Sequence, residues 1–136
     1  MASCIIVEET LHVGHETFVG GASTSPEYAV AFEGNGETGY FYDCDTSREN
    51  CIVDAMQIYN VTNVTDKHLP SQVVMAWSED GLKAGLFITQ YPPHAIFDFA
   101  ANRGYCRTNF PPPSKEWSHL HNNHEWSEGA VNLLTA

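Results

Sequence analysis

Basic side chains are scarce in this chain. Six Lys and Arg residues stand against seventeen Asp and Glu residues among 136, which gives a formal net charge of −11 at pH 7. A field of this sign repels nucleic acid and anionic lipid, and it speeds encounter with basic surfaces. The sequence also has no nucleotide-binding loop, nucleophile elbow or paired-cysteine metal motif. We therefore predict an acidic binding protein without enzymatic activity or cofactor, whose partners include neither nucleic acid nor membrane.

Long apolar runs and a basic leader are also missing. No run approaches the about 20 apolar residues that a membrane-spanning helix needs, and neither an apolar nor a basic segment precedes Cys4. These absences predict a cytoplasmic protein. The four cysteines, Cys4, Cys44, Cys51 and Cys106, form no CxxC pair. Because a chain with 43% hydrophobic residues can bury a core without covalent staples, we expect buried free thiols.

Alternating apolar residues predict a hairpin in the first half of the chain. A strand over residues 27–33 places Tyr28, Val30 and Phe32 on one face. The Gly-Asn-Gly-Glu run that follows is typical of a tight turn, and a returning strand is expected at 38–42.

The second half is expected to form a meander. Strands are predicted at 72–77, 82–89 and 94–99, with the Asp-Gly pair that ends at Gly81 as a hairpin turn. The Tyr-Pro-Pro run at 91–93 is expected to break the second of these strands. Shorter strands are expected at 3–7, 16–19 and 105–107.

One segment has the pattern of a helix. Thr46 and Glu49 fit a capping box, and Asn60 fits a stop. Between them an apolar stripe at helical spacing is formed by Ile52, Ala55, Met56 and Tyr59. The sequence therefore predicts an α+β fold, in which a mostly antiparallel β-sheet meander carries one amphipathic helix packed on a face.

The length is that of one domain. Residues 1–136 are expected to form a single domain with a core at about 27–110. The segment 114–136 differs in composition, with two Trp and three His. Because large apolar side chains such as Trp117 are rarely left in solvent, this segment is expected to wrap the body.

Two blocks of sequence resemble a known family. One runs from Phe32 to Tyr42, and the other runs from Trp77 to Ala84 and continues at 97–99 and 104–108. Together they resemble a family of small bacterial proteins known only as a domain of unknown function, over residues 28–113. The resemblance implies an immunity-type protein, since such proteins have been associated with immunity genes beside secreted toxins. Its motifs are hairpin turns and strand aromatics, so the resemblance implies no catalytic residue.

The C-terminal histidines are the candidate metal ligands. Neutral imidazoles bind zinc, nickel and copper, and the candidates are His119, His121 and His124. In a helix His121 and His124 would share a face with Glu125, whereas in an extended segment His119 and His121 would share one. The spacing fits no established metal motif, so the alternative is a polar segment whose histidines pair with acidic neighbours.

One further group contains the residue types of a thiol hydrolase. It consists of Cys106, His94 and Asp98. The strand pattern separates the three residues, and no glycine-rich elbow or oxyanion loop surrounds the cysteine. We therefore expect Cys106 to be a core residue.

Carboxylates in the predicted loops are the candidate partner-binding residues. The candidates are Glu33, Glu37, Asp43, Asp45, Glu79 and Asp80. The alternative is a local role for each, because acids stabilise helix N-termini and flank turns. If the loops share one end of the sheet, these carboxylates form a surface for a cationic partner.

The predicted function is that of an immunity protein which neutralises a cognate, basic toxin domain by occlusion. In this hypothesis carboxylates steer association and a few aromatic anchors supply most of the affinity. One alternative is a structural or homo-oligomeric module, such as a homodimer, that associates through exposed strand edges. The other is a metal-dependent enzyme that uses the C-terminal histidines.

Overall fold

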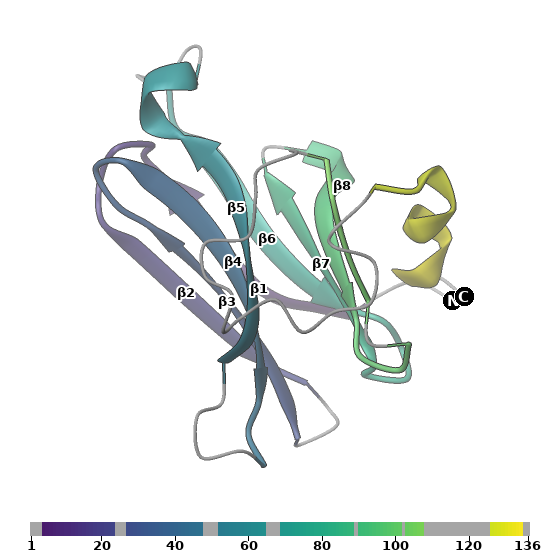
Figure 1. Cartoon of the computed structure of the whole chain (residues 1–136). Helices are drawn as coiled ribbons and strands as arrows, with labels where there is room; N and C mark the ends of the chain where they lie inside the picture. Colours follow the sequence, from purple (N-terminus) through teal and green to yellow (C-terminus); the bar gives the residue numbers. More distant parts are fainter. Residues whose placement is uncertain are drawn as a thin grey trace.

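Two antiparallel β-sheets pack face to face in the computed structural model of the chain (Figure 1). The structure describes residues 4–23, 27–47, 52–64, 69–88, 90–101, 103–107 and 126–134. One sheet has the strand order β1-β6-β7-β8-β9, and the other has the order β2-β3-β4-β5. The strands are β1 (Cys4–Leu11), β2 (Thr17–Ala22), β3 (Tyr28–Gly34), β4 (Thr38–Asp45), β5 (Ile52–Asn60), β6 (Ser71–Trp77), β7 (Lys83–Ile88), β8 (Gln90–Asp98) and β9 (Arg103–Cys106). The 3-10 helices are η1 (Val61–Asn63) and η3 (Glu128–Leu134).

The chain order explains how the two sheets arise. Strands β2 to β5 form one antiparallel meander, and strands β6 to β9 form a second. Strand β1 pairs with β6 at the edge of the second meander. The chain therefore changes sheets between β1 and β2, and it returns to the first sheet after β5, where η1 begins.

The core lies between the sheets. In β3 and β4 the inward positions include Val30, Phe32 and Phe41, which are at most 2% exposed. Phe41 meets Phe97 of the opposite sheet with ring centroids 4.9 Å apart. The predicted inward face of residues 27–33 is confirmed for Val30 and Phe32, while Tyr28 is half-buried at the margin of the core.

The predicted helix is wrong, and with it the α+β fold class. Strand β5 occupies residues 52–60, where the sequence predicts the helix, and pairs with β4 along its length. The described ranges contain no α-helix, and their architecture is a β-sandwich.

The reason lies in the irregular pairing of β5, whose register with β4 shifts twice. Asp54, Ala55, Met56 and Ile58 are all at most 1% exposed. A strand whose register shifts lacks the strict polar–apolar alternation of a regular, half-exposed strand. The spacing of its apolar residues therefore fits a helix and a strand equally well, although Ile52, Val53 and Ile58 are β-branched and favour the strand.

Of the predicted capping box, Thr46 lies in the turn that follows β4, and Glu49 lies outside the described residues. Asp45 Oδ1 accepts hydrogen bonds from the amide of Ser47 at 3.0 Å and from its hydroxyl at 2.6 Å. This is the local pattern of an Asx turn at the end of a strand. Asp45 thus stabilises the turn after β4.

Both predicted hairpins are confirmed. In the β3–β4 turn, Asn35 Oδ1 accepts hydrogen bonds from the amides of Glu37 and Thr38 at 2.7 and 2.8 Å. In the β6–β7 turn, Gly81 has a φ of 74°, a conformation that costs glycine little. The turn residues therefore predicted both hairpins correctly.

The predicted break at residues 91–93 is wrong, because β8 begins at Gln90 and runs through both prolines. The pairing of β7 with β8 jumps from Leu86–Ala95 to Ile88–Gln90. Pro92 and Pro93 fall within this irregularity, where a strand tolerates residues that lack an amide hydrogen.

The cysteines differ from one another. Cys106 is a free, buried thiol as predicted, whereas Cys44 is disulfide-bonded. The size of the core decides whether a fold needs a disulfide, but it does not decide whether two thiols are brought together. Disulfides are typical of oxidising compartments, so the cytoplasmic location stays a prediction.

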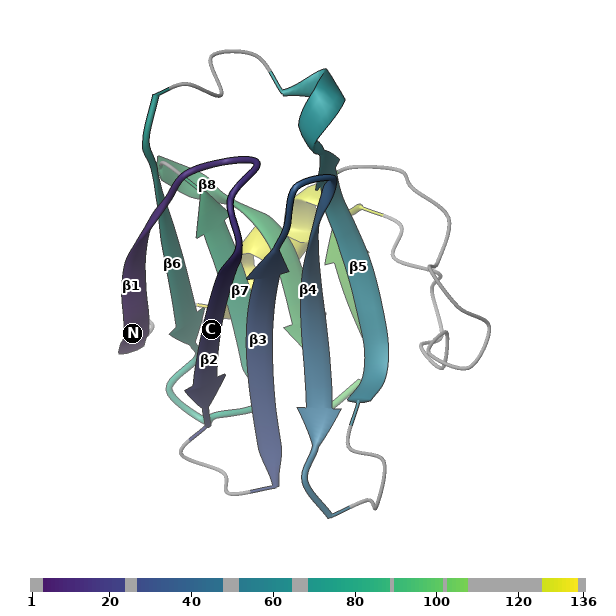
Figure 2. The ribbon, with the colours of Figure 1, turned by 90° about the vertical axis from the view of Figure 1, so that its left-hand side faces the viewer.

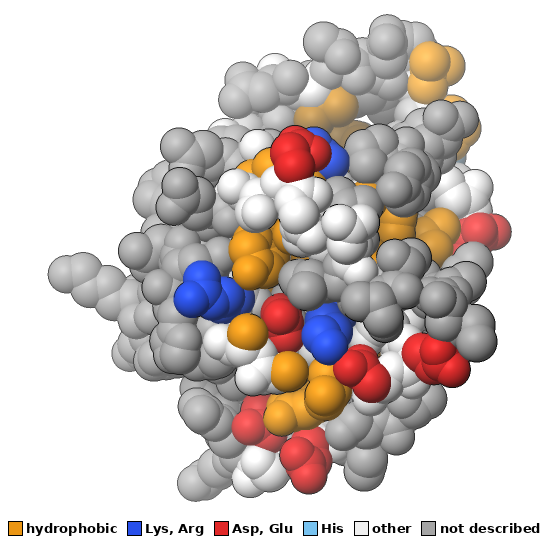
Figure 3. Space-filling view, turned by 90° about the vertical axis from the view of Figure 1, so that its right-hand side faces the viewer, with side chains coloured by type: hydrophobic (Ala, Val, Ile, Leu, Met, Phe, Trp, Pro, Cys, Tyr) orange, Lys and Arg blue, Asp and Glu red, His pale blue; other side chains and the backbone are white. Residues whose placement is uncertain are grey.

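On the outer face of the five-stranded sheet, η3 packs against β7 and β8 (Figure 1). Figure 3 shows this side of the molecule, where hydrophobic, acidic and basic side chains are interspersed. Ala130 and Leu134 of η3 pack with Ile96 of β8 in a small second core. The Arg107 guanidinium lies 4.1 Å from the ring centroid of Trp126, which holds the start of this segment against the sheet. Residues 126–134 lie against the five-stranded sheet, and residues 114–125 lie outside the described part of the chain, so the wrapping of the body by 114–136 stays a prediction. Nowhere in the described ranges is there a helix of the length and hydrophobicity that crossing a membrane requires.

Candidate functional site

The outer face of the four-stranded sheet is the candidate site. No other described element lies over this face, in contrast to the η3-covered face of the five-stranded sheet (Figure 2). Its edge strand β2 exposes Phe18, whose side chain is 68% accessible. Phe18 lies beside small apolar residues of β2 and β3, and contiguous apolar surface is typical of interaction sites.

The strand register orders the side chains of this face into three rows. Alternate residues of each strand point outward, and residues that are paired across strands stand side by side. The first row is Phe18, Glu33 and Tyr40; the second is Gly20, Ala31, Tyr42 and Ala55; the third is Ala22, Ala29, Cys44 and Ile52.

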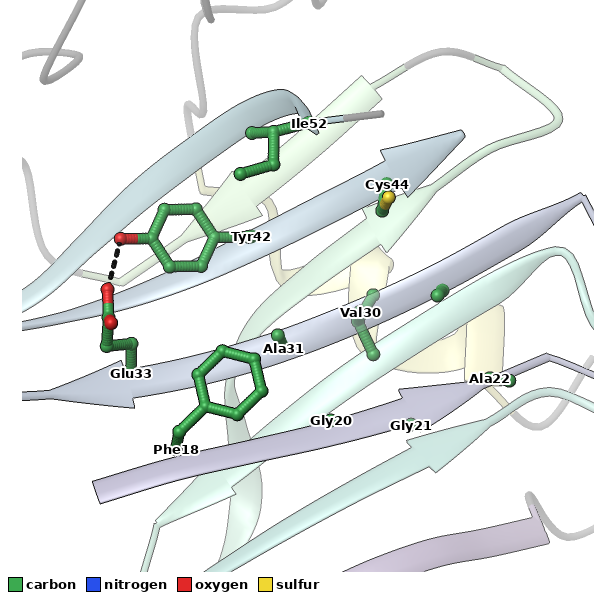
Figure 4. Close-up of a pocket in the computed structure, with 11 residues that line it drawn as sticks. Phe18, Gly20, Gly21, Ala22, Val30, Ala31, Glu33, Tyr42, Cys44 and Ile52 are labelled. Carbon is green, nitrogen blue, oxygen red and sulfur yellow. Dashed lines mark hydrogen bonds between the residues drawn. The ribbon is translucent and has the colours of Figure 1, made fainter. Parts of the chain in front are cut away.

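This arrangement leaves a hollow of about 450 Å³ in the face (Figure 4). The outward residues of β2 and β3 in the second and third rows are glycine or alanine, so they form a low floor. Phe18 bounds the floor at one end, while Tyr42 and Ile52 rise beside it from β4 and β5. The hollow is therefore a consequence of small residues placed next to large ones on adjacent strands.

A carboxylate stands at the aromatic end of the hollow. Glu33 Oε1 accepts a hydrogen bond from the Tyr42 hydroxyl at 2.8 Å (Figure 4). Burial and then the hydrogen bond to Glu33 raise the pKa of Tyr42 well above its ordinary value of 10.0. Tyr42 therefore stays protonated at neutral pH and acts as a fixed donor that orients the carboxylate.

A second hollow lies on the other side of Phe18. It has a volume of about 370 Å³ and is lined by Glu16, Thr17, Phe18, Glu33, Gly34 and Asn35. Glu33 therefore borders both hollows, and Glu16 adds a second carboxylate to the same end of the sheet. Phe18 lines both hollows as well.

Within the described ranges, neither Glu33 nor Glu16 has a Lys or Arg within ion-pair distance. Lys83 is paired with Asp80 at 2.9 Å, and Arg107 lies 3.9 Å from Glu128. Positive charge that neutralises the carboxylates of the hollows must therefore come from outside this part of the chain. Chemically, the site offers an apolar floor, aromatic walls and an oriented anion, which suits a cationic group on an apolar stem.

The predicted partner-binding carboxylates do not form one surface. Glu33 and Glu37 lie by the β3–β4 turn, and a Cβ on Gly36 would stand 3.8 Å from the carbonyl oxygen of Gly14, so the loop after β1 shares this end. Asp45 lies at the other end of β4.

The remaining predicted carboxylates lie at that second end. The Thr46 amide donates to the Glu27 carbonyl at 2.7 Å, and the Ser23 hydroxyl donates to the Gly81 carbonyl at 2.6 Å. These contacts bring the β4–β5, β2–β3 and β6–β7 connections together. Glu79 and Asp80 therefore lie near Asp45, at the opposite end of the sandwich from Glu33.

Asp43 does not belong to either surface. It is 3% exposed and faces the sandwich interior, because it shares the inward parity of Phe41 on β4. Its cross-strand neighbour on β5 is the equally buried Asp54. The loop position expected for Asp43 is wrong because β4 extends to Asp45.

Asp80 has a structural role in its turn. Its carboxylate accepts hydrogen bonds from the Ser78 hydroxyl at 2.6 Å, the Leu82 amide at 3.0 Å and the Lys83 ammonium at 2.9 Å. These contacts, with Ser78 contributing most, lower the pKa of Asp80 from 3.8 to about 2. The carboxylate is therefore already satisfied within the turn.

This lowered pKa predicts a pH dependence of stability. Because the folded pKa of Asp80 lies below the unfolded one, its contribution to the free energy of unfolding is complete above about pH 4 and lost as the pH falls to about 2. We expect an Asp80→Asn variant to be less stable than the wild type at neutral pH, with a difference that shrinks across this window. Urea unfolding at a series of pH values measures it, and a difference that stays constant down to about pH 2 would contradict the role given to Asp80.

The residues of the hypothetical thiol hydrolase do not form a catalytic group. Asp98 Oδ1 accepts a hydrogen bond from the amide of Ala101 at 3.1 Å. Asp98 is the cross-strand neighbour of Arg103 in β9. Cys106 is buried and opposes Ala95 near the other end of the β8–β9 pairing. The pKa of His94 is lowered, first by burial and then by the nearby Arg107 charge.

The predicted metal ligands His119, His121 and His124 lie outside the described residues. Among the residues that are described, no group of three or more His, Cys, Asp or Glu side chains is placed to hold a metal ion.

The residues that line the hollow were missed by sequence reasoning, except for Glu33. A signal exists, since small residues occupy alternate positions 20 and 22 in one strand and 29 and 31 in the next. It becomes readable only with the strand register, which shows that these four positions share the outer face.

A family model described as an uncharacterized protein conserved in bacteria, DUF2251, matches residues 11–135. An uncharacterized protein of Haemophilus influenzae is 42% identical over 112 residues, which cover 80% of this chain and 68% of that protein. No solved structure matches. The sequence-based resemblance to a bacterial family of unknown function is thereby confirmed, and the chain belongs to the DUF2251 family.

Proposed function

We propose that this protein is a non-enzymatic binding protein that holds a basic protein partner against the outer face of its four-stranded sheet. The observation that carries the proposal is the hollow of about 450 Å³ with Glu33 at one end. It combines apolar surface with a carboxylate that has no described cation in ion-pair distance. A partner with a cationic side chain and an adjacent apolar residue complements both features.

The composition of the face supports a protein partner. Binding energy at protein interfaces is concentrated in a few aromatic and charged anchors near the centre. Phe18 and Tyr42 supply aromatic surface on either side of Glu33 (Figure 4). The net charge of −11 adds long-range attraction for a basic partner, which raises the association rate more than the intrinsic affinity.

In its narrowest form the proposal is that of an immunity protein, which blocks a basic toxin domain by covering its active surface. The support for this form is the acidic charge together with a binding face over which no described element lies. In a cell that produces the partner, co-expression of this protein is expected to restore growth. Failure to restore growth, with binding intact, would leave the binding function and remove the neutralising one.

The proposal is tested by charge reversal at the two ends of the sandwich. The bait is the purified wild-type protein, a Glu33→Lys/Glu37→Lys variant, or a Glu27→Lys/Glu79→Lys variant. All four side chains are exposed, and both double variants have the same net charge. Lysate of a bacterium that encodes the protein is passed over each bait at low and high salt.

We expect the wild type and the Glu27/Glu79 variant to retain one basic protein in near-equal amount. The Glu33/Glu37 variant is expected to associate about tenfold more slowly, because reversed charges at the site repel the partner and add to the loss of general attraction. Surface plasmon resonance with the captured protein measures the rates. Equal slowing by both variants would show that only the overall charge matters and would contradict the site, and concentration-dependent size of the protein alone would favour a homo-oligomeric module instead.

A further inference from the structure

Strand β2 is an edge of the four-stranded sheet. It pairs with β3 on one side, and in the described ranges no strand pairs with its other side. Alternate residues of such a strand direct their amide and carbonyl groups away from the sheet. These groups form a template for an added strand.

Proteins usually protect such edges, and the other three edge strands of this sandwich are protected. β1 carries Glu8 and Glu9 and has a register shift between Ile5 and Val7. β9 is only four residues long. β5 pairs with its neighbour through two register shifts. Charges, shortness and bulges are the features that block strand addition.

β2 has none of these features. Its sequence, Thr-Phe-Val-Gly-Gly-Ala, contains no charged residue and no proline. Its six residue pairs with β3, from Thr17–Gly34 to Ala22–Ala29, follow one another without a shift. The edge that borders the hollow is therefore also the edge that is open to another strand.

We propose that an extended segment of the basic partner adds to β2 as a further strand of this sheet, and that an arginine of that segment crosses Gly20 to reach Glu33. This inference rests on the proposed function and specifies how the partner binds. Main-chain hydrogen bonds to β2 would supply affinity, and the side chain that enters the hollow would supply specificity.

Gly20 is placed so that a long side chain, such as that of arginine, can pass over it to Glu33. Gly20 is exposed and lies between Phe18 and Ala22 on the outward side of β2, so no side chain of the described strands obstructs the path from an added strand to Ala31. Glu33 is the diagonal neighbour of Gly20 on β3, within reach of long side chains across a sheet. The path runs past the Phe18 ring, a wall that favours a guanidinium through cation–π attraction.

A second copy of this chain does not fit the site. Its own β2 contains no basic residue that would reach Glu33. Two copies would also bring together two chains of net charge −11. Charge complementarity therefore selects a basic segment from a different protein.

The test uses a defined peptide and the full protein. The probe is an acetylated and amidated seven-residue peptide of alternating threonine and valine with a single central arginine. Two matched peptides replace the arginine with neutral citrulline, or carry N-methyl groups on the amides of one edge. Titration of ¹⁵N-labelled protein is followed by NMR, with hydrogen exchange of the β2 amides as a second readout.

We expect saturable changes in the amide chemical shifts, centred on residues 17–22, with a Kd on the order of 1 mM. Hydrogen exchange should slow for the β2 amides that point away from β3. Citrulline should weaken binding about tenfold, and methylation of the edge that faces β2 should abolish it. In a Gly20→Val variant, whose side chain stands in the path to Glu33, the preference for arginine over citrulline should disappear.

The inference is overturned if the shifts do not centre on β2, or if the peptide that is N-methylated on the edge facing β2 binds as well as the parent. If the peptide fails in this way while the Glu33/Glu37 reversal still slows capture of the partner, the proposed function stands and strand addition is wrong. If the reversal has no effect on capture, the proposed function itself is wrong.

Discussion

Phe41→Ala is expected to lower the free energy of unfolding by about 3–5 kcal/mol. Phe41 is 0% exposed, and its ring centroid lies 4.9 Å from the ring centroid of Phe97 in the opposite sheet. Removing it deletes contacts to both sheets and leaves a cavity that the strands cannot close without losing their register. Because domains are usually stable by only about 5–15 kcal/mol, the change should shift the urea midpoint strongly.

The neighbouring Tyr40→Ala is the matched control. Tyr40 is half-exposed on the outer face of the same strand, where its ring stacks on Tyr42 with centroids 6.1 Å apart. Loss of this surface contact should cost about 1 kcal/mol. Comparable losses for the two adjacent positions would contradict the inward and outward alternation of β4, and with it the sandwich.

The same alternation explains which parts of the fold were predictable. β3 and β4 have one face in the core, and their turn is specified locally by Asn35, so both strands and the turn follow from the sequence. The register of β5 with β4 shifts twice, so its apolar residues have no period of two. The partners that bury it come from elsewhere in the chain, and a local window does not contain them.

The candidate site shows the same limit. Glu33 and Glu37 were predicted because acidic turn residues are visible in sequence. Their separation from Asp45 and Glu79 depends on which connections meet at each end of the sandwich, which is a property of the strand order. Predicting the hollow requires the strand register in addition, because Gly20 and Ala31 become neighbours only through the register of β2 with β3.

Ala31→Trp is expected to abolish binding of the partner. Ala31 lies in the floor of the hollow, between Gly20 and Tyr42 in the second row. An indole at this position fills the space that the partner's side chain requires, so affinity should fall by about 100-fold or more, which corresponds to about 2.7 kcal/mol. The fold should survive, because tryptophan is favourable on the exposed face of a strand.

Gln72→Trp is the control for this substitution. Gln72 is exposed on β6 of the other sheet, so a tryptophan at this position adds the same indole away from the hollow. Isothermal titration of the captured partner against the wild type and both variants measures the affinities, and thermal unfolding verifies that both variants are folded. Retained affinity in a folded Ala31→Trp variant would contradict the site.

The salt dependence of binding distinguishes the loss of affinity in Ala31→Trp from the loss in the Glu33/Glu37 charge-reversal variant. Steric exclusion does not depend on ionic strength, so the Ala31→Trp defect should persist at high salt. The Glu33/Glu37 defect arises largely from exposed charges, and it should diminish as salt screens them. If both defects vanish together at high salt, the hollow contributes no apolar contact and the partner is held by the charge of Glu33 and Glu37 alone.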